Sequence, residues 1–368
     1  MRFAQRINGI EPSGIRKILD LAAGARNPVD MSIGQPDFDV PDEIKGACIG
    51  AIKEGFNRYT QSVGLPELRE RILSSQRQRG MVCEDVMVTV GAAGAMTLFF
   101  LALVDAGDEV VITDPYFLNY RHLITLTGAV PRFIETYPDF RLREEEVWRA
   151  VTPKTRLIVL NSPGNPTGMV YTRREIDWVV EAAKKWNCWI LSDEVYDRFV
   201  YDGRNCPSPA MAYEKTLVVS SFSKSSGMPG WRLGYGTGPK RLIQEIIPLQ
   251  QYLYGCAPSA AQKAGILCME RDINADRARL ERKRDLVYNG LKDHYRVEKP
   301  QGAFYLFPQA PRGDCYRFIE RALKANVFVS PGDTFSRRNS HFRISYAIPE
   351  EALKRGLGIL RNLVSEPG

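Results

Sequence analysis

The sequence predicts an α/β protein in which helices flank a mostly parallel sheet, with a smaller α+β domain toward the C-terminal end. Three observations lead to this prediction. Short apolar segments alternate with longer helical patterns through the middle of the chain. Five of these segments finish in polar, glycine-rich or aromatic residues. From about residue 271, a long charged helical pattern leads into a mixture of short strand and helix patterns.

Five apolar, β-branched segments are expected to form strands of the sheet. They cover residues 85–90, 109–113, 156–160, 189–191 and 216–220. In order, these segments are followed by GAAGA, by DPYF, by NSPGNPTG, by SDEVY and by a serine-rich segment that contains Lys224. In open α/β sheets, ligands bind outside the carboxyl ends of the strands. The five endings are therefore expected to share one site.

The segments outside the predicted sheet complete the domain organisation. Strands are expected over 301–308 and 341–347, and helices over 314–325 and 350–364. This mixture predicts a small α+β domain over 286–368, which follows a large ligand-binding domain over 45–285. Residues 1–44 contain prolines in an irregular pattern, so we expect an N-terminal arm that packs with the small domain.

Composition and charge argue against several classes of protein. The 50 Lys and Arg residues are interleaved with 43 Asp and Glu residues, a pattern typical of solvated helix faces rather than of a nucleic-acid-binding stripe. The seven cysteines include no C-x-x-C pair, which argues against a disulfide framework or structural zinc and fits a reducing compartment. The longest strongly apolar stretch, 95–104, is too short to span a bilayer. We expect a cytoplasmic protein without a nucleic-acid, membrane or metal partner.

Lys224 is the first candidate for chemistry, because it follows an apolar strand and is surrounded by small hydroxyl residues. A lysine that acts as a nucleophile must lose its proton, although the ordinary pKa of lysine is about 10.4. Burial at the end of a sheet would favour the neutral amine, and the charge of Arg232 would add to this effect. The alternative is a surface lysine in a serine-rich loop.

A candidate anion site lies at the turn that contains Gly91, Ala92 and Ala93. The backbone N–H groups of such a strand-to-helix turn can bind an anion at the helix N-terminus. The segment has neither the G-x-G-x-x-G spacing of a dinucleotide site nor the G-K-[ST] of a P-loop. With Ser221 and Arg232 nearby in the predicted site, a phosphate monoester is more plausible than a nucleotide. The small residues could instead serve close packing of helix on strand.

Asp193 follows an apolar segment and is expected to be buried, so it needs a cationic or hydrogen-bonding partner. That partner is either a cationic ligand or a helix N-terminus. Asn165 and Tyr196 could donate hydrogen bonds to a ligand, and Phe117 or Tyr116 could stack on a flat ring. Each aromatic residue by itself could equally belong to the core.

A phosphate, a flat ring, a cationic ring nitrogen facing Asp193 and an aldehyde on Lys224 together describe pyridoxal 5′-phosphate. The chain, from about residue 12 to 364, also resembles the fold type I, pyridoxal-phosphate-dependent aminotransferases of class I/II, the aspartate aminotransferase superfamily. The motifs that carry this resemblance are IGQPDF (33–38), Tyr59-Thr60 with Gly64, DPYF (114–117), NSPGNPTG (161–168), SDEVYD (192–197), SFSKSSGMPGWRLGY (221–235) and FRISYA (342–347).

The resemblance implies a role for each residue around the cofactor ring. Lys224 matches the lysine that binds the cofactor and moves the substrate proton, and Asp193 matches the partner of the ring nitrogen. Tyr196 and Asn165 match the donors to the phenolic oxygen of the cofactor, and Phe117 matches the aromatic residue that stacks on its ring. Lys224, Asp193 and Tyr196 are thus the implied catalytic residues.

The resemblance also implies the residues that hold the two anionic groups. The phosphate would be bound by Gly91, Ala92, Ala93, Ser221, Arg232 and Tyr59 of the partner subunit. The α-carboxylate of the substrate would be bound by Gly34, Asn165 and Arg343. Many relatives carry a hydroxyl or a longer polar side chain where this sequence has Ala92-Ala93. The phosphate would therefore depend on backbone amides, Ser221 and Arg232.

The activity that the resemblance implies is that of a homodimeric aminotransferase. It would take the amino group of an L-amino acid, forming pyridoxamine phosphate, and pass it to a 2-oxo acid such as 2-oxoglutarate. A pyridoxal-phosphate-dependent C–S β-lyase on the same fold is the alternative. The motifs assign no second arginine to a distal carboxylate, and the tyrosine-rich stretch 251–255 favours aromatic or neutral substrates.

Overall fold

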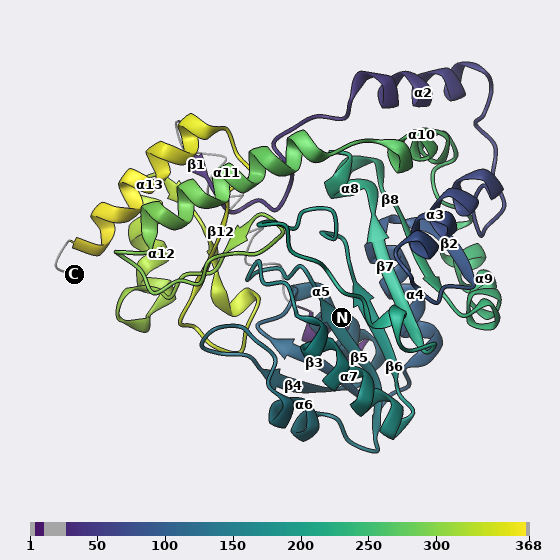
Figure 1. The fold of residues 1–368 in the computed structure, drawn as a ribbon, viewed down its shortest axis with the longest axis horizontal. Coiled ribbons are helices and arrows are strands. Elements are labelled where there is room, and N and C mark those ends of the chain that lie inside the picture. The colour runs from purple at the N-terminus through teal and green to yellow at the C-terminus, as the bar shows by residue number, and fades with distance from the viewer. Residues whose placement is uncertain (1–3, 11–26, 366–368) are drawn as a thin grey trace.

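A seven-stranded sheet forms the centre of the computed structural model, which describes residues 4–10 and 27–365 (Figure 1). Its strands, in spatial order, are β2 (Asp85–Val90), β8 (Leu233–Gly238), β7 (Thr216–Ser221), β6 (Trp189–Asp193), β5 (Thr155–Asn161), β3 (Glu109–Asp114) and β4 (Val130–Glu135). Within this sheet β8 pairs antiparallel with β2 and β7, and the other pairs are parallel. The predicted fold class, an α/β protein with a mostly parallel sheet, is confirmed.

All five segments predicted as strands belong to this sheet, but the sequence analysis missed β4 and β8. β4 has the sequence VPRFIE, and its proline is tolerated because β4 is an edge strand. β8 has the sequence LGYGTG, which lacks an apolar, β-branched run. A Cβ on Gly236 would lie 2.5 Å from the ring of Phe99, so the glycine allows α4 (Gly91–Leu103) to pack closely on the sheet.

Helices cover both faces of the sheet, as a parallel sheet requires. One face packs against α4, α5 (Leu118–Thr127) and α9 (Lys240–Tyr254), and the other against α6 (Glu144–Ala150) and α7 (Arg173–Trp186). In β5, Leu157 and Val159 join the first core, whereas Ile158 and Leu160 join the second. Because successive side chains of a strand point to opposite faces, a strand buried on both sides is apolar throughout.

A third group of helices packs at the β2–β8 side of the sheet, where Val86, Val88 and Leu233 contribute to their shared core. These helices are α2 (Asp42–Lys53), α3 (Pro66–Gln78) and α10 (Ser259–Glu270). A single helical turn, α8 (Phe222–Ser225), follows β7. Short 3₁₀ helices lie at Gln5–Gly9, Pro209–Met211, Pro229–Trp231, Pro311–Gly313 and Gly332–Thr334.

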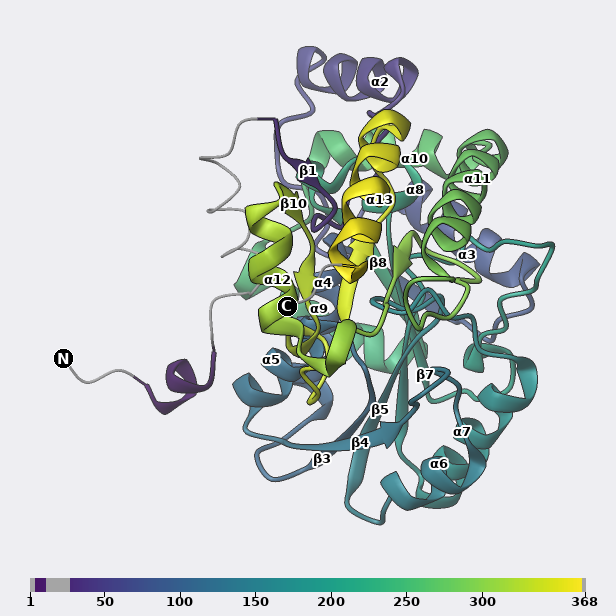
Figure 2. The same cartoon turned by 90° about the vertical axis from the view of Figure 1, so that its left-hand side faces the viewer.

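The C-terminal elements form a separate core beside the sheet (Figures 1 and 2). Its helices are α11 (Asn274–Leu291), α12 (Cys315–Lys324) and α13 (Glu350–Ser365). Its antiparallel sheet has the order β11 (Ser330–Pro331), β12 (Phe342–Ser345) and β9 (Tyr305–Leu306). β1 (Val29–Asp30) pairs in parallel with β10 (Val327–Phe328). The strands predicted over 301–308 and 341–347 are thus present but shorter.

The predicted domain limits at residues 44 and 285 remain a prediction. Both positions fall within helices, residue 44 within α2 and residue 285 within α11. Of the predicted N-terminal arm, residues 1–3 and 11–26 lie outside the described part of the chain. In the part that is described, Val29 and Met31 belong to the same core as α11, α12 and α13.

Three further features concern partners of the protein. All seven cysteines are free thiols. Among residues 4–10 and 27–365, His, Cys, Asp and Glu side chains form no group of three that could hold a metal ion. No helix in the same described ranges is long and apolar enough to cross a membrane.

Candidate active site

The strand endings identified in the sequence converge on one cavity of about 280 Å³. The ends of β5, β6 and β7 and the starts of α4 and α5 line it from the large sheet, and residues of β9 and β12 line it from the C-terminal core. The structure brings most of the predicted site residues together in this lining. They are Gly34, Ala92, Ala93, Phe117, Asn165, Asp193, Tyr196, Ser221, Lys224, Arg232 and Arg343.

Two predicted residues do not line the cavity. Gly91 lies behind it, with a left-handed φ of 69°, and a Cβ there would meet Nη2 of Arg232 at 2.5 Å. The glycine therefore lets Arg232 pack on the start of α4. Tyr59 lies between α2 and α3 and is 89% exposed. Its contact with a site across a subunit interface stays a prediction.

Lys224 lies in α8, directly after the carboxyl end of β7, and its Nζ donates to the carbonyl oxygen of Gly34 at 2.5 Å. Burial lowers the pKa of Lys224 to about 8, with further lowering by the charges of Arg343 and Arg232, while Asp193 opposes the shift. Compared with a lysine of pKa about 10.4, the neutral fraction at pH 7 is roughly a hundredfold larger or more. The amine is thus prepared to react as a base or nucleophile.

Asp193 ends β6 and is 3% exposed. The hydroxyl of Tyr120 donates to its Oδ2 at 2.5 Å, and the backbone N–H of Val195 donates to Oδ1 at 3.2 Å. Burial raises the pKa of Asp193 to about 6 against the effect of these two hydrogen bonds. Val195 lies in a turn, so no helix N-terminus satisfies the carboxylate. With no ion pair to Asp193 among the described residues, a cationic ligand remains the partner that the chemistry favours.

Tyr120 was missed in the sequence analysis. It lies three residues after Phe117 in α5, on the same helix face as the buried Leu123 and Ile124, a position typical of core residues. The Phe117 ring stands nearly perpendicular to the Tyr120 ring, with 5.6 Å between centroids, and Phe117 is half-buried at the cavity. Only the packing of α5 against the end of β6 makes the Tyr120 hydroxyl a partner of the carboxylate.

Arg343 lies in β12 and is 1% exposed. Its guanidinium donates to Asn165 Oδ1 at 3.0 Å and to the Ser32 carbonyl oxygen at 2.5 Å. It lies between two aromatic rings, 4.6 Å from the centroid of Tyr305 and 4.5 Å from that of Phe335. Its Nε has no hydrogen-bond partner, and Arg343 forms no ion pair within the described ranges. A buried cation of this kind at a cavity is suited to bind a carboxylate through two parallel hydrogen bonds.

The start of α4 and two side chains from the β7–β8 connection form the candidate anion site. Ala92 and Ala93 are in the first turn of α4, where the backbone N–H groups lack intrahelical partners. Ser221 caps α8, and its Oγ accepts from the N–H of Ser223 at 3.2 Å. The guanidinium of Arg232 donates to the Pro229 carbonyl oxygen at 2.9 Å and lies against Gly91. These groups place positive potential at one end of the cavity.

Several residues of the cavity lining were not among the predicted site residues. These are Met96, Asn119, Asn161, Val195, Ser223, Pro229 and Tyr305. Asn161 donates through Nδ2 to the Asp193 carbonyl oxygen at 3.0 Å and accepts from the Asn165 N–H at 2.7 Å, so it joins two motifs. Asn161 and Val195 lie within motifs that were already recognised, whereas no local pattern distinguishes Met96 or Asn119 from ordinary helix residues.

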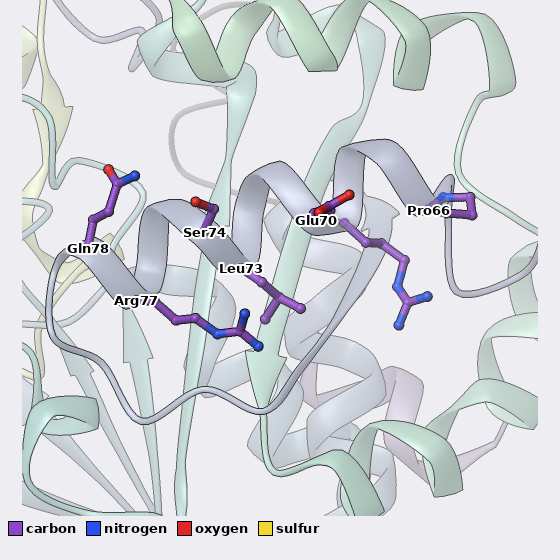
Figure 3. Close-up of a pocket in the computed structure, with 7 residues that line it drawn as sticks. Pro66, Glu70, Leu73, Ser74, Arg77 and Gln78 are labelled. Atoms are coloured by element: carbon purple, nitrogen blue, oxygen red, sulfur yellow. The ribbon is translucent and has the colours of Figure 1, made fainter.

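A second hollow lies along α3, as Figure 3 shows. It is lined by Pro66, Arg69, Glu70, Leu73, Ser74, Arg77 and Gln78. All of these residues belong to one helix, so no second element closes over a ligand there. The cavity at the end of the sheet, where polar groups from many elements converge, is therefore the candidate active site.

Comparisons with known proteins identify the family of the chain. A model of the family described as aminotransferase class I and II matches residues 26–360. The chain is 35% identical to a probable aspartate aminotransferase of Methanocaldococcus jannaschii, over 98% of this chain and 99% of that protein. It is 33% identical to aromatic-amino-acid aminotransferase 2 of Thermococcus litoralis, over 100% and 99%. A solved structure of Thermus thermophilus aspartate aminotransferase with maleate is 33% identical, with a TM-score of 0.93 over 99% of this chain and 100% of that one.

The lowered pKa of Lys224 gives a test of the site without any cofactor. In ligand-free protein, competitive labelling with acetic anhydride should modify Lys224 with a midpoint near pH 8, because only the neutral amine reacts. Lys45, whose pKa is raised by hydrogen bonds to Asp39 and Asp42, should label at higher pH. Peptide mass spectrometry measures both in one sample. Arg343→Ala should raise the labelling midpoint of Lys224, since it removes a positive charge. Equal midpoints for Lys224 and Lys45 would contradict the assignment.

Proposed function

The chain belongs to the aminotransferase class I and II family. From this membership we propose which residues of the cavity bind the cofactor, which bind the substrate and which transfer the proton. The protein is an enzyme that transfers the amino group of an amino acid to a 2-oxo acid, with pyridoxal 5′-phosphate as its cofactor. The comparisons do not favour the alternative of a C–S β-lyase.

One observation carries the proposed assignment of residues: three charged groups, two buried and one half-buried, face a single cavity without ion-pair partners in the described ranges. They are Lys224, Asp193 and Arg343. Burying a charge without a partner is costly, so such groups are retained where a ligand completes them. An amine, a carboxylate and a guanidinium match the carbonyl group, the cationic ring nitrogen and the substrate carboxylate, respectively.

The residues of the cavity fit the cofactor. Asp193 would hold the ring nitrogen, Lys224 the carbonyl carbon, and Phe117 the face of the ring. Tyr196 and Asn165 would donate to the phenolic oxygen. The phosphate would be bound by the first N–H groups of α4 and by the side chains at the same end of the cavity, Ser221 and Arg232.

The chain's own residues then move the proton. When bound, pyridoxal phosphate supplies an electron-withdrawing ring that stabilises negative charge at the substrate Cα. Asp193 would hold the ring nitrogen and favour its protonated form, because a buried carboxylate stabilises the cationic form of a partner. Lys224, which lines the same cavity and whose pKa is lowered to about 8 in the ligand-free protein, would be the base that moves the proton of the substrate Cα.

Arg343 and Asn165 would bind the α-carboxylate that donors and acceptors share. The cationic residues in the described cavity lining are Lys224, Arg232 and Arg343, and each has a proposed partner already. This supports donors with neutral or aromatic side chains. For an acceptor such as 2-oxoglutarate, the second carboxylate would be met by neutral donors such as the amide of Asn119, whose Nδ2 lies 3.8 Å from the Met96 sulfur.

We further propose that the enzyme is a homodimer in the cytoplasm, with Tyr59 reaching the phosphate of the neighbouring site. Tyr59 is 89% exposed and lies beside Gly255, the residue that follows the exposed Tyr252, Leu253 and Tyr254 at the end of α9. These large exposed side chains support an interaction surface at this position. The seven free thiols support a reducing compartment.

The direct test of the function is spectroscopic. Borohydride reduction of the protein with pyridoxal phosphate should fix the cofactor on Lys224, as located by peptide mass spectrometry. Lys224→Ala should lose turnover by several orders of magnitude and keep its fold. Single amino acids should convert the bound cofactor to pyridoxamine phosphate, and a panel of acidic, neutral and aromatic donors ranks the side chains. Release of pyruvate without that conversion would instead identify a lyase.

Arg343→Lys should weaken all amino-acid substrates together. Lysine keeps the charge but cannot form the two parallel hydrogen bonds of a guanidinium, so kcat/KM should fall by roughly 10- to 100-fold. Amines that lack a carboxylate should lose far less, and the resting absorbance of the cofactor should change little. Equal losses for amino acids and amines would remove Arg343 from the substrate site.

Mixing two impaired proteins tests the shared site. A hybrid of Lys224→Ala and Tyr59→Phe subunits should contain one site with both wild-type residues, because Tyr59 of the partner subunit would complete it. Activity should therefore exceed that of either parent after verified subunit exchange. If exchange occurs and activity stays at the parental level, Tyr59 does not act across the interface.

A further inference from the structure

One side chain contacts three groups of the site and has no role in the reaction as derived so far. We propose that Tyr305 is a positioning residue, whose hydroxyl holds Tyr196 in its donor orientation and whose ring holds the guanidinium of Arg343. The inference rests on the proposed function, which gives Tyr196 and Arg343 their roles.

The register of the small sheet explains how Tyr305 reaches this place. Tyr305 begins β9 and pairs with Ser345 of β12. Arg343 is two residues before Ser345, and residues two apart on a strand lie on the same face. Tyr305 and Arg343 are therefore diagonal neighbours on one face of the sheet, the face that lines the cavity. Tyr305 is 1% exposed, so the surrounding packing fixes its position.

The hydroxyl groups of Tyr305 and Tyr196 are 2.7 Å apart and are hydrogen-bonded. A tyrosine hydroxyl carries a single proton. If Tyr196 donates that proton to the phenolic oxygen of the cofactor, the proton between the two tyrosines must come from Tyr305. The donor order is then Tyr305 to Tyr196 to cofactor. Hydrogen bonds in such a chain polarise one another, so Tyr305 strengthens Tyr196 as a donor.

The ring of Tyr305 acts on a different partner. The guanidinium carbon of Arg343 lies 4.6 Å from its centroid, within the range of a favourable cation–π contact. The described residues give Arg343 no carboxylate partner, so the rings of Tyr305 and Phe335 hold the plane of this buried cation together with its hydrogen bonds to Asn165 and Ser32. That plane decides which way the two parallel N–H groups point.

The same hydroxyl also restricts which residue can stand at position 34, where the chain lines the cavity. A Cβ on Gly34 would lie 2.4 Å from the oxygen of Tyr305, so glycine is required for this approach. The carbonyl oxygen of Gly34 accepts from Nζ of Lys224. Tyr305 is thus in contact with the segment that faces the reactive amine, in addition to Tyr196 and Arg343.

The hydroxyl function is tested by spectrophotometric titration of the holoenzyme. Around the two tyrosines, the charged groups are Asp193 from β6, Arg343 from β12 and Lys224 from α8, and Tyr305→Phe leaves all of them in place. A donor to the phenolic oxygen stabilises its deprotonated form. Weakening that donor should move the titration midpoint of the bound cofactor to higher pH, by about 0.5–1 unit for Tyr305→Phe.

Two controls isolate the route of this effect. Tyr196→Phe should shift the midpoint further, because it removes the donor itself. In the Tyr196→Phe background, Tyr305→Phe should add no further shift, since Tyr305 acts through Tyr196. An additive shift in the double variant would show that Tyr305 acts on the cofactor directly, and would overturn the proposed donor order.

The role of the Tyr305 ring is tested by comparing KM for two substitutions, one that keeps the ring and one that removes it. Tyr305→Phe keeps the ring, so KM for amino acids should stay within about twofold, whereas Tyr305→Leu should raise it about tenfold or more. Phe335→Leu is the matched control, since it removes the other ring beside Arg343 and should raise KM without moving the titration midpoint. Cofactor content and circular dichroism verify folding; if Tyr305→Leu does not fold, the titration of Tyr305→Phe still decides the hydroxyl function.

The outcomes separate this inference from the proposed function. If Tyr196→Phe moves the midpoint and Tyr305→Phe does not, the proposed function stands and the role of the Tyr305 hydroxyl is refuted. If Tyr305→Leu and Tyr305→Phe have equal KM values, the role of the ring is refuted. If neither tyrosine affects the midpoint of a cofactor bound at Lys224, the proposed role of Tyr196 fails and the inference fails with it.

Discussion

The cost of burying charge is the constraint on which this active site depends. An amine, a carboxylate and a guanidinium face the cavity from α8, β6 and β12, and no ion pair within the described residues neutralises them. Burial disfavours the charged form of each group, so it lowers the pKa of Lys224 to about 8 and raises that of Asp193 to about 6. Both shifts reduce the charge of the ligand-free cavity, and both are of use in a reaction that moves protons.

Glu194, the residue next to Asp193, is a buried carboxylate that does have an ion-pair partner. It accepts from Arg79 at 2.8 Å and from the hydroxyls of Ser192 and Ser208. It ties α3 to the end of β6. The two consecutive carboxylates of this motif thus differ in their partners: Glu194 has an ion pair within the protein, whereas Asp193 has hydrogen bonds but no ion pair among the described residues.

The arginines likewise differ in whether they have a carboxylate partner. Arg284 of α11 is as buried as Arg343, but it pairs with Asp202 at 2.8 Å and has the ring of Tyr201 beside it. Arg337, which follows Phe335 closely in the chain, pairs with the buried Asp114 at 3.0 Å and so joins the C-terminal core to the end of β3. Both arginines thus have carboxylate partners, whereas Arg343 lies among rings and neutral acceptors and has no ion pair in the described ranges.

The sequence by itself determined the fold class, five strands of the sheet and most of the cavity lining, including Lys224, Asp193 and Asn165. Lys224, Asp193 and Asn165 follow from local patterns, because the carboxyl ends of parallel strands must meet at one edge of a sheet, whereas Gly34 and Arg343 follow from the resemblance to the family. Tertiary structure alone decided that Tyr120 donates to Asp193, that Tyr305 joins Tyr196 to Arg343, and that the glycine-rich β8 is a strand. Each depends on contact between segments distant in the chain, and an aromatic residue in an apolar pattern does not show where its hydroxyl points. Packing between segments decides where the hydroxyl points, and the pattern of a single sequence does not predict this packing.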